Sequence, residues 1–213
     1  MLKDIKLGFK LLKYGYKLKL NVIMLVFFAI FGIASEIFSK GTSIIGGVYF
    51  MMSGMFTFQL IMSMDVSELI QSTSLKKKLQ IYIPVLASTV INLILFTIFV
   101  VERVVLIQMG VADKTQIIYT LFMLDVILLI TYLYTSICYK YFVLGFILFM
   151  VMFMAAFMAL DNSAFMGFAD TIAALGLPVI ALFGYIAIFV GGALEILIGE
   201  LLYKKPLSEF AFR

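Results

Sequence analysis

The 213-residue sequence contains no histidine and a single cysteine, and both shortages narrow what the protein can do. Histidine is the commonest metal ligand and general base, so its absence removes both roles. One cysteine, Cys138, excludes an internal disulfide and any metal site built from several thiolates. The sequence also lacks the GxxxxGK[ST], HExxH and GxSxG patterns, and it has no carboxylate pair spaced for acid–base catalysis. We therefore expect no catalytic residues, no metal site and no cofactor bound by this chain.

Charged residues are also scarce, at 13% of the chain, whereas hydrophobic residues make up 64% and the mean hydropathy is +1.17. Soluble domains carry about 25% charged residues. The charges separate six apolar stretches of about 19 to 23 residues, which as helices reach about 28 to 35 Å, enough to cross the hydrocarbon core of a bilayer. The sequence thus predicts an all-α, polytopic membrane protein, with a transmembrane domain over 20–200 and spans at 20–38, 44–64, 79–101, 117–138, 142–160 and 177–198.

Basic residues fall unevenly on the two sides of this arrangement. If the N-terminus is cytoplasmic, thirteen of the sixteen lie on that side, and only Lys40, Arg103 and Lys114 lie on the other. The positive-inside rule then predicts that both termini, including a tail over 201–213, are cytoplasmic. Membrane orientation and anionic headgroups account for the net charge of +4, so no nucleic-acid partner is expected. The first apolar run is a full span, unlike the short core of a cleavable signal peptide.

Residues 1–19 are predicted to form an amphipathic helix in the membrane interface. Apolar residues recur at helical spacing from Leu2 to Tyr16, and five lysines from Lys3 to Lys17 repeat that spacing one residue later. Such a helix lies with its apolar side toward the lipid and its lysines reaching to the headgroups. Two interpretations stay open, namely an anchor that orients the first span and a segment with a mechanical role.

The segment 65–78, between the second and third spans, is longer and more mixed in charge than a hairpin needs. Asp65 or Ser67 can cap a short helix, and a lysine run ends the segment. This composition indicates a cytoplasmic surface for contact with another protein; a solvated loop with stop-transfer lysines is the alternative. The residues assigned to the contact are Ser67, Glu68, Gln71, Ser72, Thr73, Ser74, Lys76, Lys77 and Lys78.

Two connections on the far side differ in character. We expect 102–116 to be a moderate loop. The stretch 161–176 is too apolar for a free loop and too short to cross, so it predicts a re-entrant or interfacial helical pair before the last span.

Asp125 lies deep in the fourth span, and on these predicted boundaries no lysine or arginine lies inside any span to neutralise it. An isolated acid there costs about 2.5 to 3.5 kcal/mol on insertion scales. One hypothesis makes it part of a transport pathway with Gln59 and Asn92; the other makes it a structural acid hydrogen-bonded to one of them or to a tyrosine. Glu195 is expected to reach Lys204 or Lys205 in a structural contact.

Small residues gather in the second span, from Gly46 to Thr57, and in the sixth, from Gly184 to Ala193. Small residues let helices approach closely in lipid. They suit contact with another subunit, and ordinary packing within the chain is the alternative.

In its arrangement the chain resembles the membrane permease subunit of type-2 ABC exporters, whose ATPase is a separate polypeptide. The stretch 1–19 is similar to that family's interfacial connecting helix, 65–78 to its coupling helix, and 161–176 to its re-entrant extracellular helices. One departure is that many members carry a proline just before the basic residue of the coupling segment, where this chain has Ser74 and Leu75.

The resemblance implies a permease of the bacterial cytoplasmic membrane that works as a homo- or heterodimer. It would dock on separate ATPase subunits that carry the ATP and magnesium. Closure of the ATPases would push on 65–78 and move the spans around a central path. Amphipathic or lipid-like cargo, peptides among them, would suit so hydrophobic a path.

Other functions compete with this interpretation. A substrate-binding subunit of an energy-coupling-factor importer also has about six spans, but usually carries an Ala-x-x-x-Ala series in the first, where this chain has Ala29 and Ala34, five apart. A proton-coupled secondary transporter would act alone and use Asp125 as its proton site. An assembly role without transport would leave Asp125 replaceable.

Overall fold

The structure, a computed structural model, describes residues 6–7, 10, 18–50, 52, 72, 74–110, 112–138, 140–161 and 166–206. Within these ranges the chain is almost wholly helical and contains no strand. A helical stretch at 44–50 also follows the first long helix. The named helices are α2 (Leu18–Ser39), the π-helical turn η2 (Lys78–Tyr82), α5 (Ile83–Met109), α6 (Lys114–Cys138), α7 (Phe142–Asp161), α8 (Met166–Leu175) and α9 (Leu177–Leu202).

Four stretches of helix are long and apolar enough to cross a membrane, which gives the chain the build of a multi-pass helical membrane protein. Their bounds are Lys19–Ser39, Lys78–Met109, Lys114–Cys138 and Leu177–Leu202. α7 coincides with the predicted span 142–160 and contains a shorter apolar helix, Val143–Met152. Most of the predicted span 44–64 lies outside the described residues, as does most of the predicted interfacial helix 1–19.

The third span is longer than predicted, and the loop expected at 102–116 is wrong over most of its length. α5 runs on to Met109 and ends at Gly110, whose left-handed conformation (φ 63°) closes the last turn. α6 begins only four residues later, at Lys114. Charged residues at 102 and 103 favour a position in water, but Arg103 is fully buried. The expectation that no basic residue lies inside a span is therefore also wrong.

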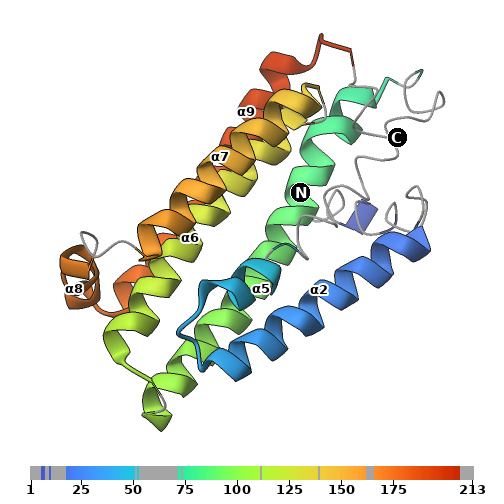
Figure 1. Cartoon of the computed structure of the whole chain (residues 1–213). Coiled ribbons are helices and arrows are strands. Elements are labelled where there is room, and N and C mark those ends of the chain that lie inside the picture. The colour runs from blue at the N-terminus through green and yellow to red at the C-terminus, as the bar shows by residue number, and fades with distance from the viewer. Residues whose placement is uncertain are drawn as a thin grey trace.

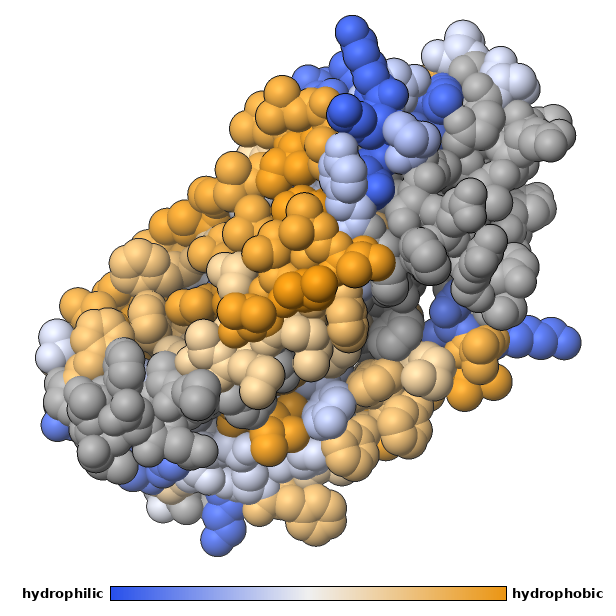
Figure 2. All heavy atoms as spheres, turned by 45° about the horizontal axis from the view of Figure 1, so that its top comes forward, coloured by the Kyte–Doolittle hydropathy of each residue, from blue (hydrophilic) through white to orange (hydrophobic). Residues whose placement is uncertain are grey.

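α6 is the central helix of the fold. In the most apolar stretch of α6, 72% of the residues are buried, whereas the corresponding share is 39% or less in the other three spans. It packs along α9, α7 and α8, while α5 packs along α9 (Figure 1). In the same view α2 lies on the opposite side of α5 from α7. Hydrophobic residues cover much of the side of the molecule, and hydrophilic residues gather toward its ends (Figure 2).

Several glycines sit where helices meet within the chain, and Gly46 and Gly184 among them belong to the small-residue clusters. A Cβ at Gly32 would come within 2.6 Å of the Phe50 backbone nitrogen, so α2 and the stretch 44–50 cross in direct contact. A Cβ at Gly46 would come within 2.7 Å of Glu36. At Gly184, a Cβ would overlap the ring of Phe96 and crowd an oxygen of Asp125. These glycines serve packing inside the chain.

Candidate functional site

Asp125 is buried at the centre of the fold, with 4% of its surface exposed. α6 presents it to α9 at Gly184 and to Phe96 of α5, which places it where three helices meet. Among the described residues, neither of its carboxylate oxygens has a hydrogen-bond partner. Placing an acid inside a membrane span is energetically costly, so an acid kept at this position is a candidate functional residue.

Asn92, the second predicted pathway residue, lies on α5 facing α6, but it does not bind Asp125. Its amide nitrogen donates to the hydroxyl of Tyr132 at 2.9 Å. Tyr132 is two helical turns beyond Asp125, a distance of about 10 Å along the axis. Asn92 and Asp125 therefore face the same interior without touching. The third member, Gln59, lies outside the described residues.

Glu195 is a second buried acid, which the sequence argument did not place in the interior. It is 3% exposed and lies beside Thr135 and Cys138 of α6. Within the described part of the chain no ion pair joins it to Lys204 or Lys205, so the expected contact is wrong. Thr135 donates its hydroxyl to carbonyl oxygens of its own helix. Glu195 is held inward because α9 lies along α6.

A sequence signal could have found Glu195. It continues the series Gly184, Ile188 and Gly191 at spacings of 4, 3 and 4, which defines one face of a helix. Gly184 and Gly191 are the two points where α9 meets Asp125 and Tyr132. We call Asp125, Asn92, Tyr132 and Glu195 the buried polar line, since they follow one another along the interior faces of α5, α6 and α9.

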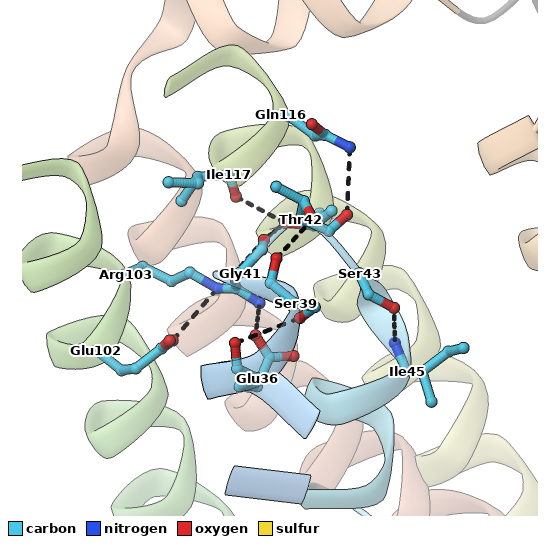
Figure 3. A network of polar contacts seen from close by, with 11 residues as sticks. Glu36, Ser39, Gly41, Thr42, Ser43, Ile45, Glu102, Arg103, Gln116 and Ile117 are labelled. Atoms are coloured by element: carbon cyan, nitrogen blue, oxygen red, sulfur yellow. Dashed lines mark hydrogen bonds and ion pairs between the residues drawn. The ribbon is translucent and has the colours of Figure 1, made fainter. Parts of the chain in front are cut away.

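A charged cluster surrounds Arg103, near the C-terminal end of α5 (Figure 3). The sequence did not predict a site here. Its guanidinium forms a 2.7 Å ion pair with Glu36 at the end of α2 and donates a hydrogen bond to the Gly41 carbonyl oxygen. Glu102 lies 3.6 Å away, and the ring of Phe99 lies 4.4 Å beneath the guanidinium. We name these residues the Arg103 cluster.

The Arg103 cluster joins three parts of the chain. The Gly41 carbonyl also accepts a bond from Thr120 of α6 at 3.2 Å. Arg103 therefore fastens the turn after α2 to α5 and α6. Its buried charge is paired and hydrogen-bonded within the chain, as a structural contact requires. We assign this cluster to the architecture and leave the buried polar line as the candidate site.

The described end of the predicted contact segment is attached to the end of α9. Lys77 forms a 2.9 Å ion pair with Glu200, and the hydroxyl of Tyr82 donates to the same carboxylate oxygen. The hydrogen bond to Glu200 raises the pKa of Lys77 above its ordinary value. Lys76 lies 6.0 Å from the centre of the Tyr203 ring.

The rest of that segment is described only in part. Ser72, Ser74 and Lys78 are exposed. The remaining predicted contact residues, Ser67, Glu68, Gln71 and Thr73, lie outside the described residues. Within the described part of the chain, no group of three or more acidic or cysteine side chains is placed to hold a metal ion.

Comparison with protein-family models, with curated proteins and with solved structures gives no match to this chain. Its function is therefore argued from its own residues.

Proposed function

We propose that the chain is the membrane permease subunit of an exporter driven by a separate ATPase, built like the type-2 ABC exporters. It pairs with a second permease in the bacterial cytoplasmic membrane, keeps both termini in the cytoplasm and crosses six times. Its cargo is amphipathic or lipid-like, with peptides as one class.

The observation that carries this proposal is the contact of Lys77 and Tyr82 with Glu200. The contact links the contact segment to the cytoplasmic end of α9. α9 in turn packs along α6 over most of its length, past both Glu195 and Asp125. A displacement of the segment by a partner would thus be delivered to the helices that hold the buried polar line.

The π-helical turn η2 supports the same route. It stands between the contact segment and α5, where its residues Gln80 and Ile81 are buried. π-helical turns are rare and occur frequently at functional sites. η2 therefore places a local change in helical winding where a displacement of the contact segment would reach α5.

The course of the chain supports six spans. Contacts between Lys140 and Lys205 and between Tyr82 and Glu200 bring together the start of α5 and the ends of α6 and α9. Bonds of Arg103 and Thr120 to Gly41 bring the opposite ends together. α7 then returns the chain to that opposite end. α8 follows α7 and precedes α9 in the chain, where the resemblance predicts re-entrant helices.

The test is purification of the tagged chain from its native membrane in mild detergent, followed by mass spectrometry. We expect an ATPase with a P-loop in stoichiometric amount, and loss of most of it when Lys76, Lys77 and Lys78 are replaced by alanine. The control replaces Lys40 and Lys114, two exposed lysines at the opposite end, and should retain the ATPase. Recovery of a stable chain without any ATPase would contradict the proposal.

A second candidate, proton-coupled transport by the chain alone, is favoured by the two buried acids Asp125 and Glu195. Neither has an ion-pair partner among the described residues. In proteoliposomes without nucleotide, an imposed proton gradient should then drive proton flux that Asp125→Asn abolishes, because the amide keeps the shape and cannot release a proton. Asp113→Asn, at an exposed position, is the control. Equal flux in the wild type and Asp125→Asn would eliminate this candidate.

A further inference from the structure

A pocket of about 320 Å³ opens at the end of the bundle where α9 stops, and its walls are strongly basic. Among the described residues its lining includes Lys76, Gln80, Lys140, Tyr203, Lys204 and Lys205, and none of the described lining residues is acidic. The four lysines come from three separate segments, namely the start of the third span, the connection after α6 and the residues after α9. Only the fold brings them together.

Gln80 shows that the pocket is more than a charged surface. Its side chain lines the pocket and is 3% exposed, yet within the described part of the chain neither its amide nitrogen nor its amide oxygen has a hydrogen-bond partner. A buried amide without a hydrogen-bond partner is energetically unfavourable. A ligand in the pocket that accepts and donates hydrogen bonds would remove that cost.

The lysines provide the complementary charge. No carboxylate of the described chain lies within ion-pair distance of Lys76, Lys204 or Lys205. Lys140 is almost fully buried, and its ammonium donates to the Lys205 carbonyl at 2.6 Å, which holds the two segments together across the pocket. Like charges gathered in one hollow repel each other, and an anion between them reverses the sign of that interaction.

The position of the pocket selects the class of anion. Lys76 precedes the third span by two residues, Lys140 follows α6 by two, and Tyr203 directly follows α9. All three therefore lie at the boundary between hydrocarbon and headgroups. Exposed apolar side chains adjoin the pocket along the chain, with Leu201 82% and Leu197 56% exposed on α9, and Val143 55% exposed on α7.

We propose that this pocket binds the phosphate-bearing headgroup of an anionic phospholipid, with the acyl chains along the exposed residues of α7 and α9. Basic pockets between spans on the cytoplasmic side are suited to such headgroups. The site shares Lys76, which lies near the Tyr203 ring, with the surface proposed to meet the ATPase, whereas Lys77 binds Glu200 and does not line the pocket. The proposal does not depend on ATP-driven transport.

The experiment is native mass spectrometry of the full chain after incubation with an equimolar mixture of phosphatidylglycerol and phosphatidylcholine that have the same acyl chains. We expect a clear preference for phosphatidylglycerol. Each lysine near the phosphate contributes about fivefold, so replacing Lys76, Lys204 and Lys205 by glutamine should remove the preference. Gln80→Leu, which leaves the charge unchanged, should reduce it by about fivefold.

The control replaces Lys40 and Lys114 by glutamine, which removes positive charge at two exposed positions at the opposite end of the fold. It should keep the preference, and the lysine variants should melt at the wild-type temperature. Equal retention of the two lipids by the wild type, or equal losses in the pocket and control variants, would overturn the proposal. Binding of inorganic phosphate without any lipid preference would assign the pocket to a soluble anion and overturn it as well.

Discussion

At the scale of single residues, Arg103 shows how the chain accommodates a charge inside a membrane helix. Its contacts with Glu36 and Glu102, the Gly41 carbonyl and the Phe99 ring surround the guanidinium with opposite charge, an acceptor and a π face. A buried ion pair is weak evidence of stability by itself, but removing one partner leaves the other charge uncompensated. Removing Arg103 alone should therefore lower the free energy of unfolding much more than replacing Arg103 and Glu36 together.

Replacing Arg103 by methionine should destabilise the protein by about 3 to 5 kcal/mol, because Glu36 is left buried without its partner. The double variant Glu36→Gln, Arg103→Met should recover a large part of that loss. Thermal unfolding in detergent measures both, with Lys114→Met at an exposed position as the control. A single variant as stable as the wild type would show that the pair does not hold this end of the fold.

Residue-level prediction from the sequence succeeded where an isolated polar residue stood deep in an apolar run. Asp125 and Asn92 were identified in this way; Asp125 is buried, and Asn92 is half-buried and donates a hydrogen bond to Tyr132, while their role in a pathway stays a prediction. It failed for Arg103 and Glu195, which stand near the ends of apolar runs. At such positions the sequence does not distinguish a side chain that leaves the protein from one that pairs inside it, because the partner, Glu36 for Arg103, is distant in sequence.

At the scale of helices, the fit of α9 against α6 depends on residues without side chains. Gly184 leaves room for the Phe96 ring and Asp125, and Gly191 leaves room for Tyr132. Helices in lipid have little hydrophobic drive to associate, so close packing of this kind supplies much of the attraction.

Gly184→Val should therefore separate α9 from α6 and cost about 1 to 3 kcal/mol, as overpacking does. Ala193→Val, at an exposed position on the same helix, is the matched control and should change stability little. Unfolding in detergent compares the two. Similar melting temperatures for both variants and the wild type would show that the contact is loose.

The contact between the segment before α5 and the end of α9 is different in kind. The Lys77 and Glu200 side chains are 48% and 37% exposed, and ion pairs at that exposure contribute little to stability. We expect Lys77→Glu and Glu200→Lys each to lower cargo transport per ATP hydrolysed severalfold in the reconstituted complex, without a change in melting temperature. The double swap, which restores the pair, should restore coupling. Failure of the swap to rescue would show that the pair does not transmit the push.

Most helix positions could be predicted from the sequence, because runs of apolar residues that span a bilayer are unambiguous. The predicted spans 20–38, 117–138, 142–160 and 177–198 each fall within a helix of closely similar bounds. The end of α5 could not be predicted, since the sequence places charge at Glu102 while the helix continues to Met109. The pairing of η2 with α9 through Tyr82 and Glu200 also required the fold, as the two residues are 118 positions apart.

At the scale of the whole molecule, basic residues divide between two ends, and this division determines the expected orientation. Lys140, Lys204 and Lys205 gather at one end, while Lys40 and Lys114 lie at the other, beside the turn at Gly41 and at the start of α6. The spatial arrangement agrees with the division deduced from the sequence.

Single-cysteine labelling tests that orientation. Cys138 is buried, and a Cys138→Ser background provides a clean reference. In intact cells, a membrane-impermeant maleimide should label Lys114→Cys at once and Lys204→Cys only after permeabilisation. Labelling in the opposite order would invert the topology.

The bond between Arg103 and Gly41 also has a consequence for biogenesis, since its partners are 62 residues apart in the chain. A ribosome adds about 5 to 20 residues per second, so Gly41 and the nearby Glu36 exist for about 3 to 12 seconds before Arg103 is made. During that interval the first span carries an acid without its counter-charge into the translocon. The first span therefore reaches its final position in the bilayer only when the third span, with Arg103, arrives.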